Sequence, residues 1–204
     1  IPPFDRVVIE TSGLADPIPI IHTLMTNQPL QQVFFLDVVL CVVDAEHGLS
    51  SLDAYDEASK QIALADVLLI SKVDIVKQSQ CAELASKLRH LNSGAEIVEV
   101  ALGEVDPSRL FGRSLFQPNP NDARISAWLS MNDDLNSHVS GYNSHVIQHS
   151  APLSLAGTTV FLNRIVNELS GNILRIKGLA FFRDKGGRPA LLHAVQNKFY
   201  PVEW

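Results

Sequence analysis

The stretch that decides the fold lies near the start of the chain and reads Ile9-Glu10-Thr11-Ser12-Gly13-Leu14-Ala15-Asp16-Pro17. The apolar residues before it predict a short buried strand over 4–11. A strand that ends in a carboxylate and is followed three residues later by a glycine is typical of the second half of the phosphate site in P-loop nucleotide hydrolases. There the carboxylate, here Glu10, holds a water on Mg²⁺. The glycine, here Gly13, can offer its N–H to the γ-phosphate because it permits close approach.

The same stretch has a second interpretation, in which a strand end leads into a helix start. Asp16 would then cap the helix and Pro17 would open it, and we expect this for these two residues in either case. If the phosphate interpretation holds for Glu10 and Gly13, loss of the γ-phosphate would release residues 11–17 as a switch.

A second motif, Ser71-Lys72-Val73-Asp74, follows a strand predicted at 67–71 and nearly matches the guanine-reading motif Asn-Lys-x-Asp. Asp74 can accept hydrogen bonds from N1 and N2 of guanine, and the stem of Lys72 can pack along the ring. Adenine lacks that donor pair, so a buried carboxylate would stay unpaired against it, which costs roughly 1–3 kcal/mol. Ser71 offers one donor where Asn offers two, so we expect weaker affinity with the choice of guanine retained.

Two further places at the ends of predicted strands invite a role. Leu102 and Gly103 follow the predicted strand 96–101, and loops in that position line the ligand crevice of α/β sheets. Backbone contact with the base and a purely structural loop are equal alternatives for them. Asp44 ends the predicted strand 38–44, and a helix or turn cap is its favoured role.

The front of the chain alternates continuous Val, Ile and Leu strands with helices predicted near 17–26, 52–64 and 79–91. This pattern predicts a doubly wound α/β fold with a parallel sheet. We assign residues 1–111 to the back half of a nucleotide-binding domain. Residues 112–144, rich in Asn, Ser, Asp, Pro and Gly, form a linker with a short helix around 123–131. Residues 145–204 form a small α+β domain in the order β-α-β-β, beginning with a strand at 145–150.

Composition narrows the function. The net charge of the 204 residues is −6, so nucleic acid and anionic membranes are poor partners. No apolar run approaches the roughly 20 residues of a transmembrane helix. Cys41 and Cys81 are expected as buried apolar residues rather than a disulfide or metal pair, which fits a reducing, cytoplasmic compartment. Four histidines lack the defined spacing of a zinc site and are expected to be structural or solvated: His138, His145, His149 and His193.

Taken together, these motifs resemble the CobW family, the GTPases related to the hydrogenase and urease nickel chaperones. The resemblance rests on residues 5–17, Val42-Val43-Asp44-Ala45, Gln61-Ile62-Ala63-Leu64-Ala65-Asp66, Ser71-Lys72-Val73-Asp74, and Gly103 with Val105-Asp106. The back portion resembles the CobW C-terminal domain through Leu174-Arg175-Ile176-Lys177-Gly178 and His193-Ala194-Val195-Gln196. The resemblance covers residues 1–110 and 145–204, but not the linker.

The resemblance implies a partial P-loop NTPase sheet of the SIMIBI type and a GTP-hydrolysing metallochaperone. Such a protein uses GTP with Mg²⁺ and delivers zinc or cobalt to metal-requiring client proteins, with a link to cobalamin biosynthesis; a homo-oligomer is open. Carried over, the phosphate and Mg²⁺ side falls to Glu10 and Gly13, with Glu10 acting through water. The nucleotide side falls to Ser71, Lys72, Asp74, Leu102 and Gly103.

Two family features are absent from the sequence: the Gly-x-x-x-x-Gly-Lys-Ser/Thr loop and a Cys-x-Cys-Cys motif. In the family both precede the position of Ile1, so we expect this chain to be the carboxyl-terminal part of a longer protein. Without the loop's backbone N–H groups and lysine around the β- and γ-phosphates, we expect this part alone to hydrolyse little or no GTP. The alternative function is a non-catalytic docking module derived from a CobW-like G protein.

Overall fold

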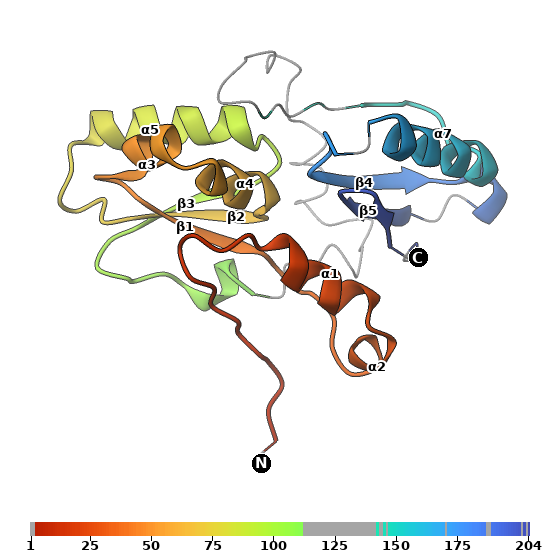
Figure 1. Ribbon diagram of the computed structural model, residues 1–204, viewed down its shortest axis with the longest axis horizontal. Helices are drawn as coiled ribbons and strands as arrows, with labels where there is room; N and C mark the ends of the chain where they lie inside the picture. Colours follow the sequence, from red (N-terminus) through yellow and green to blue (C-terminus); the bar gives the residue numbers. More distant parts are fainter. Residues whose placement is uncertain are drawn as a thin grey trace.

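The computed structural model describes residues 3–111, 142, 145, 147–169, 171–186, 189–200, 202 and 204. Within them the chain forms a parallel three-stranded sheet with helices, followed by an antiparallel three-stranded sheet with one long helix (Figure 1). The predicted fold class, a parallel α/β sheet followed by a small α+β domain, is confirmed. The predicted linker at 112–144 and its short helix at 123–131 lie almost wholly outside the described residues.

The first sheet is built from β1 (Leu40–Asp44), β2 (Val67–Ser71) and β3 (Glu96–Val100), all parallel in the order β1-β2-β3. These are three of the four strands predicted for the front of the chain. The central strand β2 is buried through its first four residues, as its unbroken apolar run requires. The register pairs Asp44 with Ser71 and Ser71 with Val100. All three strands therefore finish at one edge of the sheet.

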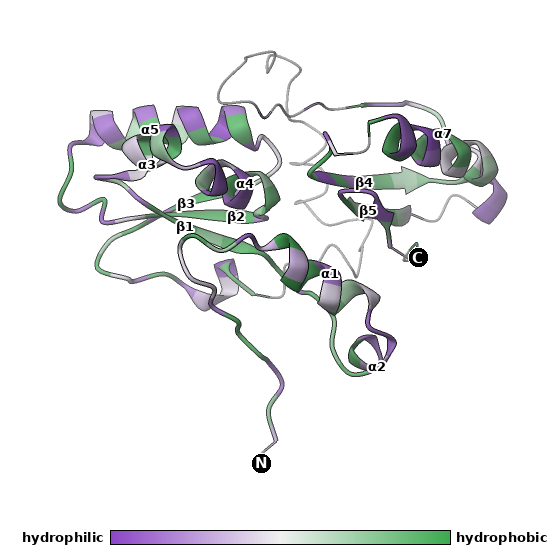
Figure 2. Ribbon diagram, in the orientation of Figure 1, coloured by the Kyte–Doolittle hydropathy of each residue, from purple (hydrophilic) through white to green (hydrophobic). Residues whose placement is uncertain are grey.

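The helices of this part are α1 (Ile18–Thr26), α2 (Gln28–Gln31), α3 (Gly48–Ala54), α4 (Asp56–Leu64), α5 (Gln78–Leu91) and the short η1 (Pro107–Arg109). The single helix predicted near 52–64 is wrong: it is two helices, because Tyr55 between them takes an extended backbone conformation. The apolar stripe of α5 is confirmed, since Cys81, Leu84, Ala85, Leu88 and Leu91 are all buried. Figure 2 shows the resulting division, with hydrophobic strands and helices of mixed character over them.

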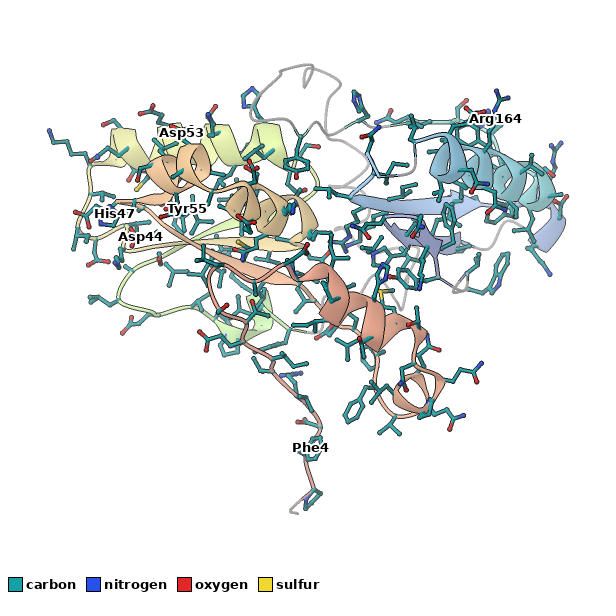
Figure 3. All side chains as sticks on the ribbon, viewed as in Figure 1. Phe4, Asp44, His47, Asp53, Tyr55 and Arg164 are labelled. Atoms are coloured by element: carbon teal, nitrogen blue, oxygen red, sulfur yellow. The ribbon has the colours of Figure 1, made fainter. Side chains whose placement is uncertain are left out.

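The strand predicted at 4–11 is wrong. This segment belongs to no sheet in the structure, and its apolar side chains Phe4, Val7, Val8 and Ile9 are exposed. Figure 3 shows Phe4 away from the body of the sheet. A strand exists only where a partner completes its hydrogen bonds, and within the described residues β1 pairs with β2 alone. The chain instead leads into α1, which is anchored elsewhere.

The second sheet is built from β4 (Arg175–Phe181), β5 (Pro189–Val195) and β6 (Lys198–Phe199), antiparallel in the order β4-β5-β6. The helix α7 (Leu155–Glu168) precedes it, and η2 (Arg183–Lys185) lies in the connection between the antiparallel strands β4 and β5. The strand predicted at 145–150 is wrong, because the described residues there are irregular. His149 is hydrogen-bonded locally to Ala151, and Leu153, just after this segment, makes a parallel bridge to Phe182.

The two parts share an apolar cluster. Ile18, Ile21 and Met25 of α1 and Leu64 of α4 pack with Val195 and Tyr200 of the second sheet. The ring nitrogen Nε2 of His22, also on α1, lies 3.3 Å from the carbonyl oxygen of Val195. Burial of these side chains provides the apolar contribution to docking of the parts.

An ion-pair cluster lies at the same junction. Asp66, just before β2, binds Arg175 of β4 at 2.8 Å and Lys177 of β4 at 2.6 Å through one carboxylate oxygen. Its other oxygen accepts the N–H of Val39 at 3.0 Å. Arg175 also donates to the carbonyl of Leu64 at the end of α4. The carboxylate and both cations are therefore paired where water has little access.

Candidate nucleotide site

The predicted nucleotide residues meet at the edge where the parallel strands end. Asp74 lies in the loop after β2, its side chain is exposed, and its Oδ1 accepts the backbone N–H of Leu102 at 3.3 Å. This bond joins the Ser71–Asp74 loop to the loop after β3. The carboxylate is thus neither enclosed by the core nor separated from the second loop. The structure brings Ser71, Lys72, Asp74, Leu102 and Gly103 to one corner.

The backbone of this corner is unusual. Lys72 and Leu102 have positive φ angles of 60° and 51°, and Gly103 has a φ of 76°. A non-glycine residue in this region costs about 1–3 kcal/mol and tends to occur at binding or catalytic sites. Within the described residues only Gln196 is a further non-glycine case. Two of the three cases therefore lie in the two loops that the motifs single out.

Ser71 and Lys72 are both tied to β1. The hydroxyl of Ser71 donates to the carbonyl oxygen of Val43 at 3.3 Å, so this side chain links the end of β2 to the end of β1. The ammonium of Lys72 lies 2.6 Å from a carboxylate oxygen of Asp44. Sequence reasoning missed the second contact, although the parallel pairing of two strands that end in Asp44 and Ser71 could have suggested it.

Glu10 and Gly13 lie apart from this corner. Both are exposed, and within the described residues no hydrogen bond or ion pair joins Glu10 to the two nucleotide loops. The Gly13 segment is held by α4 instead, because Nε2 of Gln61 donates to the carbonyl oxygens of Gly13 and Ala15 at 3.0 and 2.9 Å. The helix start is shifted by one residue from the expected one, because α1 begins at Ile18 with Pro17 as its N-cap. Asp16 still contributes to this start by accepting the N–H of Ile18 at 2.9 Å. Sequence reasoning missed this contact of Gln61, although Gln61 is the first residue of the Gln61–Asp66 motif.

The structure offers no ready-made metal centre within the described residues. No group of three or more His, Cys, Asp or Glu side chains there could hold a metal ion. Cys41 and Cys81 are free thiols, and burial raises the pKa of Cys41 to about 11. His145 and His149 are exposed and His193 is buried, while His138 lies outside the described residues. Glu10 alone is a poor magnesium site, but it fits a ligand that acts through water beside substrate phosphates.

The strand edge, the two loops and the parallel sheet define a nucleotide-binding domain of the P-loop NTPase type, to which a small α+β domain is joined. The family is shown by two sequence profiles: "CobW/HypB/UreG, nucleotide-binding domain" matches residues 2–99, and "Cobalamin synthesis protein cobW C-terminal domain" matches residues 142–204. The chain belongs to the CobW/HypB/UreG family.

Among curated proteins, the chain is similar to the zinc chaperone YjiA of Escherichia coli, with 28% identity over 201 residues, 98% of this chain and 61% of YjiA. It is also similar to the zinc-regulated GTPase metalloprotein activator 1 of Schizosaccharomyces pombe, with 31% identity over 104 residues, 50% of this chain and 25% of that protein. The chain therefore spans about three fifths of the length of YjiA and a quarter of the activator.

A crystal structure of a Zn(II)-bound triple mutant of YjiA GTPase matches with a TM-score of 0.70 at 25% identity, over 94% of this chain and 58% of that one. The Zn(II)-bound YjiA GTPase from E. coli matches with a TM-score of 0.65 at 22% identity, over the same shares. Both likenesses support the fold class described above. In the part of the chain that the structure describes, every helix is too short or too polar to cross a membrane.

Proposed function

We propose that the protein to which this chain belongs is a GTP-dependent metallochaperone that delivers zinc to client metalloproteins. The proposal draws on membership of the CobW/HypB/UreG family and on similarity to a protein named a zinc chaperone and to one named a GTPase metalloprotein activator. Cobalt cargo and a link to cobalamin synthesis are the less favoured form of the proposal, because the curated relatives named here are zinc proteins. The two free cysteines agree with work in a reducing compartment such as the cytoplasm.

The observation that carries the guanine specificity is the placement of Asp74. Its carboxylate stands exposed at the strand edge, and one oxygen is oriented by the N–H of Leu102. Since a carboxylate accepts hydrogen bonds at both oxygens, Asp74 keeps capacity for the two donors on the edge of guanine. Lys72 lies two residues before it, with its side chain half exposed. On this proposal Glu10 and Gly13 serve the phosphate and Mg²⁺ side, and residues 1–111 form the GTP-binding part.

The test is Asp74→Ala in the full-length protein, with affinities for GDP, IDP and ADP measured by competition against a fluorescent nucleotide. We expect the affinity for GDP to fall by about 10-fold or more, because each hydrogen bond between a charged group and a neutral one contributes about 1.5–3 kcal/mol. The preference for GDP over IDP, which lacks the 2-amino donor, should disappear. Asp53→Ala is the matched control, because it removes an exposed carboxylate on α3. Figure 3 shows Asp53 apart from Asp44 and His47.

Two results would count against this function. An unchanged preference for GDP over IDP in Asp74→Ala would remove the base-reading role. Turnover of GTP by residues 1–204 alone, at the rate of the full-length protein, would show that the phosphate site does not need the loop that this sequence lacks.

One observation favours the second candidate, a non-catalytic docking module. Phe4, Val7, Val8 and Ile9 expose apolar side chains in an extended segment, and Val42 is exposed on β1, whose outer edge is unpaired within the described residues. Unpaired strand edges and apolar patches mark interaction surfaces. If the full-length protein binds a client equally well with and without GTP, the docking function is favoured over the GTPase cycle.

A further inference from the structure

The ion pair between Lys72 and Asp44 links the guanine motif to a residue outside it. Asp44 is the last residue of β1 and Lys72 follows the last residue of β2, and the strands are paired in parallel so that Asp44 lies opposite Ser71. The ammonium and the carboxylate are 2.6 Å apart. The pair therefore spans two neighbouring strand ends at the edge where the nucleotide residues gather.

Asp44 is itself held firmly. Its Oδ1 accepts the backbone N–H groups of Glu46 and His47 at 2.8 and 3.2 Å, while its Oδ2 binds Lys72. Burial acts to raise the pKa of Asp44, but the hydrogen bonds from Lys72, Glu46 and His47 outweigh it and hold that pKa below its usual value. Figure 3 shows Asp44 and His47 together at this end of the sheet. The turn-cap role expected from the sequence is thus present, and it uses only one of the two oxygens.

Lys72 is restrained at both ends. Its backbone takes the left-handed conformation, with a φ of 60°, and its ammonium is bound to Asp44 at the other end. About half of the side chain is exposed, 53%, so the stem between these two fixed points is accessible to a ligand. A long lysine stem otherwise samples many rotamers, and ordering it on binding reduces affinity.

We propose that Asp44 is a positioning residue of the nucleotide site: it fixes the Lys72 stem as a preformed apolar support for the face of the purine ring. This inference rests on the proposed guanine site at Asp74. The stem can carry the ring without leaving Asp44, because the contact uses its methylene groups and the charge is already satisfied. Asp44 therefore raises affinity for the base, and Asp74 chooses which base it is.

The test is a double-mutant cycle in the full-length protein with Asp44→Asn and Lys72→Met. Asparagine keeps the oxygen that caps Glu46 and His47, and methionine keeps most of the stem without its charge. We expect each single variant to weaken GDP binding by about 3- to 10-fold, and the double variant to be no weaker than the weaker single one, since the two residues act as one unit. Inhibition of nucleotide binding by pyrophosphate should be unchanged in these variants, because the expected loss of affinity concerns contacts with the base and not with the phosphates. Asp53→Asn is the matched control.

Three outcomes would overturn the positioning role. One is GDP binding by Asp44→Asn that equals or exceeds that of the wild type, which would make the pair neutral or a contact that competes with the base. The second is additive losses in the double variant. The third is an equal loss of pyrophosphate inhibition, which would show a general structural effect. If Asp44→Asn is unstable, Lys72→Met alone decides through the same GDP and pyrophosphate measurements. If these measurements contradict the positioning role while Asp74→Ala loses GDP affinity as expected, only the role of Asp44 is removed. If Asp74→Ala keeps its preference for GDP over IDP, the proposed guanine site itself is removed.

Discussion

At the scale of single residues, the corner at Asp74 shows which site residues can be predicted from the sequence and which cannot. The motif Ser71-Lys72-Val73-Asp74 and the Leu102-Gly103 loop are recognisable from residue types and from their place after strands, and the structure brings them together through the Asp74–Leu102 hydrogen bond. The partner of Lys72 was not predicted. Asp44 lies in another strand, and only the pairing of β1 with β2 brings its carboxylate within reach.

His193 is a residue that the proposed nucleotide chemistry does not use, and it makes stability depend on pH. Its burial lowers its pKa from 6.5 to about 3, and the positive charges of Arg175 and Lys177 act in the same direction. The negative charge of Asp66 acts in the opposite direction but is outweighed. Between these two values the unfolded chain binds a proton that the folded chain excludes. Stability is therefore full above about pH 6.5 and falls as the pH is lowered towards 3.

We expect the free energy of unfolding of residues 1–204 to fall by up to about 1.4 kcal/mol per pH unit from this residue between pH 6 and 4.5. This range lies above the pH at which Asp66 titrates in the unfolded chain. His193→Gln should flatten the slope, whereas His149→Gln, at an exposed histidine, should leave it unchanged. Urea unfolding at pH 7, 6, 5 and 4.5 measures it. An equal slope in His193→Gln and the wild type would contradict the assignment.

At the scale of elements, α4 links the Gly13 segment to the rest of the first part. Gln61 donates to two carbonyl oxygens of that segment, and Leu64, three residues on, packs at the junction with the second sheet. The segment expected to act as a switch is therefore attached to α4 by the two hydrogen bonds of Gln61 and by an ion pair in which Lys60 lies 3.9 Å from Asp16.

Gln61→Ala should loosen residues 11–17 without unfolding α4. The two lost hydrogen bonds contribute about 0.5–1.5 kcal/mol each, or about 1–3 kcal/mol together, so we expect amide hydrogen exchange in the segment to become roughly 5- to 150-fold faster. Exchange in α4 itself should change little. Mass spectrometry of peptides from residues 11–17 measures the effect, with Gln78→Ala on the exposed start of α5 as the control. Unchanged exchange in the segment would show that something other than Gln61 holds it.

Elements with their own internal signal could be predicted, and those that depend on a distant partner could not. The strand β2 was predicted at its observed bounds, because its apolar run is continuous, and the stripe of α5 follows from its spacing. Residues 4–11 carry an equally strong strand signal, yet the structure leaves them outside the sheet. Propensity favours an extended backbone but does not supply the neighbouring strand. The break at Tyr55 has no glycine or proline to mark it.

At the scale of the whole molecule, motifs far apart in the sequence meet at one junction. Asp66 closes the Gln61–Asp66 motif, and Arg175 and Lys177 belong to the Leu174–Gly178 motif of the second part; the structure joins them in one ion-pair cluster. The helix α1, which directly follows the Gly13 segment, packs on Val195 and Tyr200 beside that cluster. No sequence pattern predicts the ion-pair cluster, because a charged residue indicates that it needs a partner but not where in the sequence that partner lies.

Asp66 tests how far the junction stabilises the fold. Its side chain is 16% exposed, and those of Arg175 and Lys177 are 11% and 25% exposed, so Asp66→Asn leaves two poorly hydrated cations without a counter-charge. We expect the free energy of unfolding to fall by about 3–5 kcal/mol, with faster hydrogen exchange in β4. Asp53→Asn, at an exposed carboxylate, should stay within about 0.5 kcal/mol of the wild type. Combining Asp66→Asn with Arg175→Met and Lys177→Met should recover most of the loss, because no charge is then left unpaired. A wild-type urea midpoint for Asp66→Asn alone would show that the cluster is open to water and that the apolar contacts of α1 hold the two parts together.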